Sequence, residues 1–261
     1  MKKQIFLLLT LIFCFVTMMI PVSAQSEIPL NWYCIRNKDH KQPRVDTELQ
    51  FVDKYDGYYV DRRHGDNCEK KMIYLTFDAG YENGNIEKVL NVMKSENVKG
   101  AFFVLGNLIE KNPMLIKRMV DEGHIVCNHT YTHKDMTKLS EEEFATELDR
   151  LNTSFTKCTG QEMARYYRPP EGKFSEKSLK WAQKLGYKTI FWSFAYADWD
   201  NDKQMDPHSA KEKILSNIHN GAVLLLHPTS KTNALILEDV IRELKAQNYE
   251  FGTLDELVKT S

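Results

Sequence analysis

Two histidines four residues apart, His129 and His133, are the residues whose type and spacing most directly suggest chemistry. This spacing directs both imidazoles to one side of a helical turn, or of a tight loop that follows a strand. Imidazole is the commonest protein ligand of transition metals. The pair therefore suggests a metal site, but surface histidines at this spacing also arise easily, so other segments must supply the rest of the evidence.

Three other ionisable residues directly follow apolar, strand-like segments, namely Asp78, Arg168 and His227, and Asp198 with Trp199 lies in the loop after another such segment. Each has a structural explanation when taken alone. Asp78 could cap the next segment, Arg168 could be a surface cation, and His227 could be a buried core histidine. Their common position at strand ends instead favours one active site, because the carboxyl ends of parallel strands share one rim.

These residue types together suggest hydrolysis of an amide or an ester. A divalent metal held by His129 and His133 would lower the pKa of bound water and polarise a carbonyl. Asp78 could accept the proton of that water, and Arg168 could pair with the carboxylate and keep it ionised. His227 could protonate the leaving group.

The elements that must position these residues alternate regularly after Lys71. Strand-like segments are expected at 72–77, 101–105, 124–127, 164–167, 188–192, 222–226 and 249–251. Segments of helical periodicity lie between them, with start signals such as the capping box of Ser140 and Glu143. The alternation predicts an α/β fold with parallel strands. Seven strand–helix units favour a distorted (β/α) barrel over an open doubly wound sheet.

The chain before Lys71 divides into two parts. Residues 1–24 have the pattern of a signal peptide, with two lysines, an apolar run and the small residues Val22-Ser23-Ala24; a retained membrane anchor is the alternative. Cleavage would remove two lysines and no acid, which changes the net charge from −1 to −3. Residues 25–70 are expected to form an irregular N-terminal wrap whose aromatic side chains pack on the core rather than line a sugar site. Residues 71–261 form the predicted catalytic domain.

The totals fit one large domain, since 42% of the 261 residues are hydrophobic. The charge is nearly balanced and lacks a basic stripe, so we do not expect nucleic acid as a partner. Once the leader is removed we expect a secreted protein on the cell-wall side of the membrane, with no stable membrane span. The remaining cysteines are few for an exported chain; we expect mostly free thiols, with pairing left open, at Cys34, Cys68, Cys127 and Cys158.

Over about residues 70 to 258 the chain resembles the polysaccharide deacetylases with the NodB homology domain. Five motifs follow in that family's order: Thr76-Phe77-Asp78-Ala79-Gly80, His129-Thr130-Tyr131-Thr132-His133, Arg168-Pro169-Pro170-Glu171-Gly172, Asp198-Trp199 and Leu225-Leu226-His227. The resemblance implies a distorted (β/α) barrel that removes acetyl groups from acetylated sugars with a divalent metal. It implies that Asp78 is the base, His227 the acid and Arg168 the residue that orients Asp78. It makes His129 and His133 the metal ligands, and it places Tyr167, Pro170 and Trp199 at the sugar site.

Two positions depart from the family pattern. Most relatives have a metal-ligating aspartate where this chain has Ala79, so the protein would supply only two histidine ligands. We expect a divalent metal, with zinc as the first candidate, bound more weakly than usual. Relatives often have a further aspartate four residues before Trp199, where this chain has Ala195. His227 is therefore expected to rely on another partner or on none.

One branch of the family resembles the chain more fully, namely the peptidoglycan N-acetylmuramic acid deacetylases of the PdaA type. The stretches that carry this resemblance are Asn31-Trp32, Lys54-Tyr55-Asp56 and Gly80-Tyr81-Glu82-Asn83-Gly84. The branch acts in muramic δ-lactam formation in the spore cortex. It implies peptidoglycan strands as partner, coupling to an N-acetylmuramoyl-L-alanine amidase that first removes the stem peptide, and a location between forespore and mother cell.

Three alternatives remain open at this point. The chain could deacetylate N-acetylglucosamine polymers. It could be an inactive glycan-binding module, which Ala79 and Ala195 would favour. A glycosidase needs two carboxyl groups that flank the scissile bond, and only Asp78 is clearly placed, with Glu171 and Asp198 as uncertain second candidates.

Overall fold

The computed structural model describes residues 27–259, so the predicted signal peptide lies outside the described residues. All seven predicted strands are present: β3 (Lys71–Ala79), β4 (Ala101–Val104), β5 (Ile125–Asn128), β6 (Tyr166–Tyr167), β8 (Lys188–Ile190), β9 (Ala222–Leu226) and β10 (Tyr249–Phe251). The pairs that these strands form are parallel. The prediction of parallel strand–helix units is confirmed.

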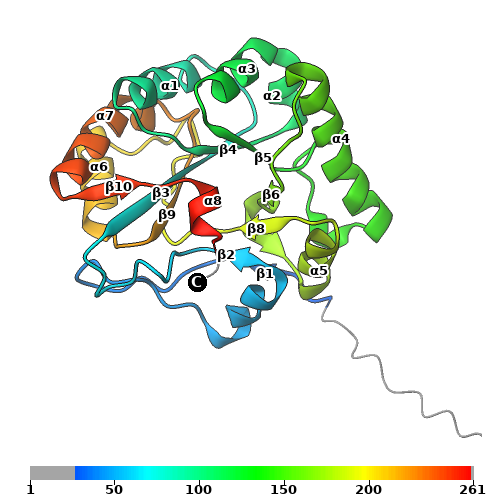
Figure 1. Ribbon diagram of the computed structural model, residues 1–261, viewed down its shortest axis with the longest axis horizontal. Coiled ribbons are helices and arrows are strands. Elements are labelled where there is room, and N and C mark those ends of the chain that lie inside the picture. Colours follow the sequence, from blue (N-terminus) through cyan, green and yellow to red (C-terminus); the bar gives the residue numbers. More distant parts are fainter. Residues whose placement is uncertain (1–26, 260–261) are drawn as a thin grey trace, which may run out of the picture.

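The strands curl into a distorted barrel (Figure 1). Their order is β10-β3-β4-β5-β6-β8, and β9 pairs with the other edge of β3. One edge of β3 serves two neighbours, because residues 71–73 pair with β10 and residues 76–79 pair with β4. A single parallel bridge between Phe194 and Leu224 joins the continuation of β8 to β9. The barrel therefore closes here through one bridge rather than through a continuous pair of strands.

Helices cover the outside of the barrel, as Figure 1 shows. They are α1 (Ile86–Ser95), α2 (Gly106–Lys111), α3 (Pro113–Asp121), α4 (Glu141–Thr159), α5 (Glu176–Lys184), α6 (Pro207–Asn217) and α7 (Lys231–Ala246). The capping box of α4 forms as predicted, since Ser140 and Glu143 exchange hydrogen bonds of 2.8 and 3.2 Å. The α4 helix ends at Gly160, whose φ of 75° suits a residue without a Cβ atom. The short helix α2 was not predicted.

The barrel is buried on both faces of its strands. Along β3, Met72 and Tyr74 point into the barrel, while Ile73, Leu75 and Phe77 pack with the surrounding helices. This alternation is the period of two that a strand imposes. The short helix α8 (Leu254–Leu257) packs on the inward cluster and lies over the middle of the ring in Figure 1. It therefore closes the end of the barrel opposite to the carboxyl ends of the strands.

The N-terminal wrap is more ordered than expected. It contains a 3₁₀ helix, η1 (Thr47–Tyr55), and two short strands, β1 (Leu30–Asn31) and β2 (Gly57–Tyr58). The strand β2 joins the barrel sheet beside β8, and β1 pairs with β7 (Lys173–Phe174). Trp32 is 5% exposed and stacks on Phe191 at a ring distance of 4.2 Å. This ring packs against the core, as predicted.

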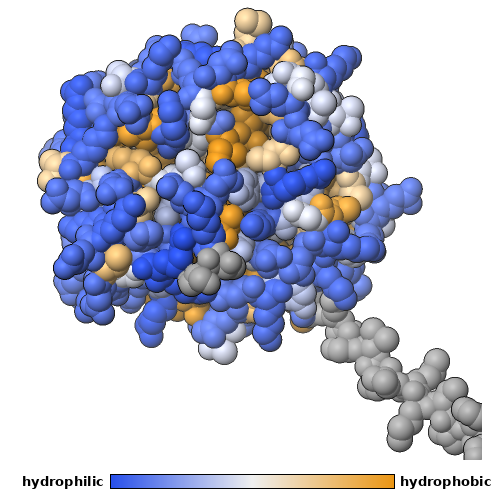
Figure 2. Space-filling model, viewed as in Figure 1, coloured by the Kyte–Doolittle hydropathy of each residue, from blue (hydrophilic) through white to orange (hydrophobic). Residues whose placement is uncertain are grey.

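The surface seen in Figure 2 is mostly hydrophilic, with apolar side chains showing between the outer helices. Among residues 27–259, no helix is both long and apolar enough to cross a membrane. The four cysteines of this part of the chain, at positions 34, 68, 127 and 158, are free thiols. Cys127 is buried in β5, in agreement with its predicted position in a strand.

Candidate active site

The predicted rim residues meet at the carboxyl ends of the strands. A cavity of about 740 Å³ is lined there by residues that include Asp78, His129, His133, Trp199 and His227. These residues come from the ends of β3, β5 and β9 and from the loop after β8. The register of the parallel strands therefore brings together side chains that lie up to 149 positions apart in the sequence.

Arg168 lies beneath this cavity and is completely buried. Its Nη1 donates to Asp78 Oδ1 at 2.7 Å, and its Nη2 donates to Thr76 Oγ1 at 2.9 Å. The guanidinium also stacks over the ring of Phe103, 4.1 Å from the ring centroid. Burial favours the protonated form of Asp78, but the charge and hydrogen bond of Arg168, together with the nearby His129 and His227, outweigh burial and hold the pKa of this carboxyl below its ordinary value. Asp78 is thus an ionised proton acceptor at neutral pH.

His129 presents a free ring nitrogen to the cavity. Its Nδ1 lies 2.8 Å from the carbonyl oxygen of Arg168, and because a carbonyl only accepts, Nδ1 carries the proton. The Nε2 atom then has a lone pair and lies 3.5 Å from Asp78 Oδ2. Burial lowers the pKa of His129 to about 4 and also lowers the pKa of His133. Both imidazoles are therefore neutral near pH 7, and their ring centroids are 5.0 Å apart.

The histidine pair sits on a tight loop rather than on a helix. Thr130 and His133 both have positive φ angles, 71° and 59°, which are uncommon for residues with a Cβ atom. The loop is held in this shape from two sides. Thr130 Oγ1 accepts from the His133 amide at 2.9 Å, and buried Glu147 of α4 accepts from the amide and hydroxyl of Thr132 at 2.9 and 2.8 Å.

Two neutral imidazoles fit a transition-metal ion such as zinc, and a backbone carbonyl that fixes one tautomer is the usual outer support of such a ligand. Within residues 27–259, no group of three or more His, Cys, Asp or Glu side chains is arranged to hold a metal ion. Ala79 lines the cavity but has no donor atom. The residues therefore fit an ion with two protein ligands whose other positions are open to water or substrate.

His227 has a partner other than residue 195, which is one of the two outcomes expected from the alanine at that position. Asp198 Oδ1 lies 2.7 Å from His227 Nδ1, and Asp198 Oδ2 accepts from the His227 amide at 2.8 Å and from Asn233 Nδ2 at 2.6 Å. Burial alone would lower the pKa of His227, but the hydrogen bond and charge of Asp198 outweigh burial and raise it. The sequence placed Asp198 in the right loop, but could not show that this carboxylate reaches the histidine.

The predicted sugar-contacting residues have different outcomes. Trp199 is 61% exposed, lines the cavity, and its ring lies 6.1 Å from that of His227. Pro170 is buried beside the cavity, whose wall is formed by its neighbours Glu171 and Gly172.

The prediction for Tyr167 is wrong. Its side chain is 1% exposed and packs with Phe144 and Tyr187 on the outer side of β6, because successive side chains of a strand point to opposite faces. Arg168, the next residue, points inward. Three cavity-lining aromatics were not predicted from the sequence: Tyr81, Trp192 and Tyr196. For Tyr81 the branch-specific stretch 80–84 was the available signal.

The other carboxyl groups near the cavity do not form a glycosidase pair. Asp198 is occupied by His227 and Asn233. Glu171 is in an exposed ion pair with Lys173, 2.5 Å between Oε2 and Nζ. The arrangement of an ionised base, a histidine with a raised pKa and two neutral imidazoles suits acyl transfer to water instead.

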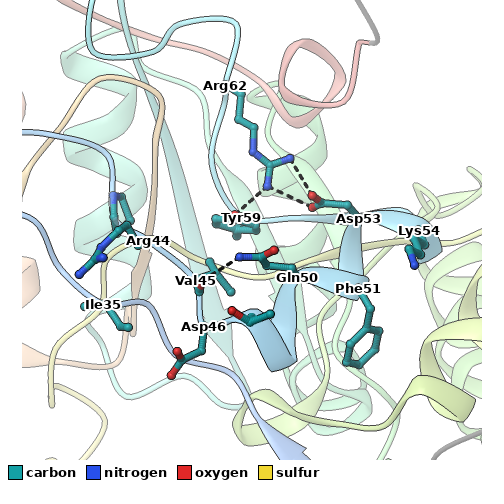
Figure 3. A pocket seen from close by; sticks show the side chains of 12 residues that line it. Ile35, Arg44, Val45, Asp46, Gln50, Phe51, Asp53, Lys54, Tyr59 and Arg62 are labelled. Carbon is teal, nitrogen blue, oxygen red and sulfur yellow. Dashed lines mark hydrogen bonds and ion pairs between the residues drawn. The ribbon is translucent and has the colours of Figure 1, made fainter.

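A second cavity, of about 780 Å³, lies within the N-terminal wrap (Figure 3). Two arginines line it, and one of them, Arg62, is already paired with Asp53 at 2.9 Å and donates to Tyr59 at 2.7 Å. The cavity contains no histidine, and none of the predicted site residues lines it. The sequence-predicted chemistry therefore belongs to the cavity at the barrel rim.

Comparison with known proteins agrees with this geometry. The sequence model of the polysaccharide deacetylase family matches residues 65–190. The chain is 43% identical over 231 residues to the peptidoglycan-N-acetylmuramic acid deacetylase PdaA of Bacillus subtilis, a match that covers 88% of this chain and 86% of that protein. The solved structure of that PdaA, described as a family 4 carbohydrate esterase, superposes with a TM-score of 0.83 and covers 89% of this chain and 97% of the other.

Two further relatives widen the comparison. A family 4 carbohydrate esterase from Bacillus anthracis is 37% identical, with a TM-score of 0.75 over 91% of this chain and 100% of the other. A peptidoglycan-N-acetylglucosamine deacetylase of Bacillus cereus is 32% identical over 196 residues, 74% of this chain and 70% of that protein. The matches to PdaA and to the Bacillus anthracis esterase cover 88% and 91% of this chain, more than the part from residue 65 to the end. Both matches therefore extend into the N-terminal wrap.

Proposed function

The chain belongs to the polysaccharide deacetylase family, and we propose that it is a metal-dependent peptidoglycan deacetylase that hydrolyses the N-acetyl group of N-acetylmuramic acid. The observation that carries the chemistry is the pairing of Asp78 with Arg168 and of His227 with Asp198 across one cavity. The substrate is proposed from the 43% identity to a protein of that name.

The chain's own residues supply the proton transfers of this hydrolysis. Asp78, ionised through Arg168, accepts a proton from the attacking water, whose oxygen forms a bond to the acetyl carbon. His227 donates a proton to the sugar nitrogen as the carbon–nitrogen bond breaks, so that acetate and a free amine are released. When bound by His129 and His133, a divalent ion supplies a Lewis acid that polarises the acetyl carbonyl.

Asp198 and Arg168 act on these two groups rather than on the substrate. Asp198 accepts from His227 Nδ1–H and so leaves Nε2 as the ring nitrogen that can donate into the cavity. Arg168 prevents Asp78 from rotating by holding Oδ1, while Oδ2 faces His129. Trp199 and Tyr81 are 61% and 44% exposed at the rim and offer apolar ring surface to a sugar.

The proposal extends to the biological setting. A substrate muramic acid whose stem peptide has been removed carries a free lactyl carboxyl group, and the amine released by deacetylation can close onto it as a lactam. This order of reactions requires an amidase that acts before the deacetylase. It also requires export of the deacetylase, which the predicted signal peptide would provide. The cortex of the spore, between forespore and mother cell, is the site that the branch resemblance implies.

The test is acetate release from purified peptidoglycan strands with and without stem peptides, with and without a chelator, and with mass spectrometry of the deacetylated sugar. Chelator-sensitive release from peptide-free muramic acid is the expected result. Acetate release from N-acetylglucosamine alone would contradict the proposed substrate and favour N-acetylglucosamine, which the name of the Bacillus cereus relative specifies. Glycan binding without any release would instead identify an inactive binding module.

A further inference from the structure

One wall of the cavity is built from the segment that follows β8. Trp192, Ala195 and Tyr196 of this segment line the cavity, and Asp198 and Trp199 follow directly. On one edge the segment is held by β9: Ser193 donates to the Val223 carbonyl at 3.0 Å, and the Leu225 amide donates to the Phe194 carbonyl at 2.9 Å. The carbonyl groups of Trp192 and Ala195 belong to the other edge, where no barrel strand pairs with them.

Two side chains of the N-terminal wrap occupy that edge. Trp32 Nε1 donates to the Trp192 carbonyl at 2.8 Å, and Arg36 Nη2 donates to the Ala195 carbonyl at 2.7 Å. The guanidinium of Arg36 also lies over the ring of Phe194, 4.9 Å from its centroid. Side-chain donors thus take the place of a neighbouring strand at both carbonyls.

Trp32 also contacts a second wall of the cavity. Its amide donates to the Gly172 carbonyl at 2.8 Å, and its Cβ atom lies 3.2 Å from the position that a side chain on Gly172 would occupy. Gly172 in turn lies against Trp192 and lines the cavity. One residue of the wrap therefore connects the loop after β6 with the segment after β8.

We propose that Trp32 and Arg36 are positioning residues of the active site, which hold the segment 192–195 so that Asp198 meets His227 and Trp199 stands at the rim. Neither residue touches the cavity, and both precede the region that the family model matches. The inference depends on the proposed function in one respect only, which is that kcat and KM are measured for the proposed reaction. The underlying claim, that the wrap orients Asp198 against His227, stands on the hydrogen bonds described above.

The physical reason is the sensitivity of proton transfer to geometry. Asp198 lies only three residues beyond Ala195, so a movement of the backbone at the Ala195 carbonyl also displaces Asp198. A misplacement of about 1 Å at a reacting group can cost on the order of 100-fold in rate. Loss of the wrap contacts would loosen the segment 192–195 only in part, because β9 still holds its other edge. The loss in rate should therefore be smaller than about 100-fold.

The test uses substitutions that preserve packing. Trp32→Phe keeps an aromatic ring against Phe191 and removes the Nε1 donor with part of the indole, which leaves Cys34 Sγ, at 3.4 Å, as a weak donor to the Trp192 carbonyl. Arg36→Met keeps an apolar chain beside Phe194 and removes the guanidinium. We expect the double variant to lose roughly 10-fold in kcat, a smaller effect than a full misplacement would cause. KM should change less than kcat.

Arg44→Ala is the matched control. Arg44 is an arginine of the same wrap, paired through its backbone with Ile35, and its side chain lines the wrap cavity of Figure 3 rather than the active site. We expect kcat, KM and melting temperature of this variant to stay near those of the parent protein.

A readout independent of turnover is the NMR titration of the His227 ring in the parent and the double variant. The charged and titratable groups around this ring are Asp198, Asp78, Arg168 and His133. Of these four groups, Asp198 is the one that follows the segment held by the wrap along the chain. We expect the titration midpoint of His227 to fall in the double variant and to stay unchanged in Arg44→Ala.

Three results would overturn the proposal. The first is a folded double variant with kcat and His227 midpoint unchanged. The second is a lower melting temperature with parental kcat per folded molecule, which would make the contacts merely structural. The third is an equal loss in Arg44→Ala. If the parent itself releases no acetate, the proposed function fails, while the His227 titration still decides this inference.

Discussion

Arg168 and Asp78, 90 positions apart in the chain, form an ion pair of 2.7 Å in which the arginine side chain is fully buried and the aspartate is 9% exposed. The two guanidinium nitrogens outside the pair are also held, since Nε donates to the Ile190 carbonyl and Nη2 donates to Thr76 and to the Phe191 carbonyl. The pair is thus a rigid part of the barrel, and it sets the charge of the base before any substrate binds.

Arg168→Met should leave Asp78 as an unpaired buried carboxylate. Breaking a buried pair on one side costs about 3–5 kcal/mol, so we expect a loss of this size in urea unfolding at pH 7. In the parent, the depressed pKa of Asp78 contributes stability that is present above its unfolded value of about 3.9 and is lost as pH falls through the lower folded value. The acid limb of kcat should move to higher pH in the variant.

Lys173→Met, which breaks an exposed pair, is the control and should cost less than about 1 kcal/mol of unfolding free energy. Equal losses of unfolding free energy in Arg168→Met and Lys173→Met would contradict the argument.

Asp78→Asn should remove turnover while leaving glycan binding in place, since the proton acceptor is lost while the side-chain volume is kept, together with an oxygen that can accept from Arg168. General base catalysis contributes about 10²–10⁴-fold, and kcat should fall by at least that range. Binding is measured by calorimetry with an unreacted oligosaccharide, and Asp121→Asn at an exposed position controls for the change in net charge. Near-parental turnover would show that another group accepts the proton.

His129→Ala and His133→Ala should each weaken metal uptake, because either change removes half of the protein's ligand set. Metal content after dialysis against a weak chelator is measured by elemental analysis, with zinc loaded first. His208→Ala removes a histidine that is exposed on α6 and serves as the control. If metal content is the same in all three variants, the ion is not held by the histidine pair.

Asp198→Asn should lower the pKa of His227, because the negative charge that outweighs burial is removed. In the parent, the raised pKa keeps His227 protonated to higher pH, so kcat falls only as pH rises through that raised value. In the variant the alkaline limb should lie at lower pH. The stability supplied by the pair is present below the unfolded value of about 6.5 and is lost as pH rises through the folded value. A pH–rate profile with an unmoved alkaline limb, or the same shift in the exposed-site variant Asp202→Asn, would argue against Asp198 as the tuning group.

Trp199 and Tyr167 offer a contrast between an exposed and a buried aromatic residue. Trp199→Ala should raise KM roughly 10-fold without destabilising the fold, as expected for an exposed aromatic anchor of a ligand. Tyr167→Phe should leave KM unchanged and preserve or slightly raise the melting temperature, because the buried Tyr167 hydroxyl has no hydrogen-bond partner among the described residues. A rise in KM for Tyr167→Phe would restore this residue to the sugar site.

Several features of the protein follow from local sequence alone. The apolar run of β3 and the helical spacing around α1 and α4 are local patterns, and they identified the strands and the order of the units. Parallel strands share one rim, so the positions of Asp78 and His129 directly after two such strands were enough to predict that their side chains lie together. The short helix α2 was missed because it begins at Gly106 directly after β4 and has no side-chain cap.

Other features depend on contacts between segments far apart in the chain, and only the tertiary structure decided them. Asp198 reaches His227 because its loop folds back over the end of β9, which no spacing in the sequence reveals. Tyr167 turns outward because β6 alternates its faces, and two residues are too few to show that alternation in the sequence. The contacts of Trp32 and Arg36 with the cavity wall span about 160 positions, and side-chain donors to backbone carbonyls leave no periodic signal.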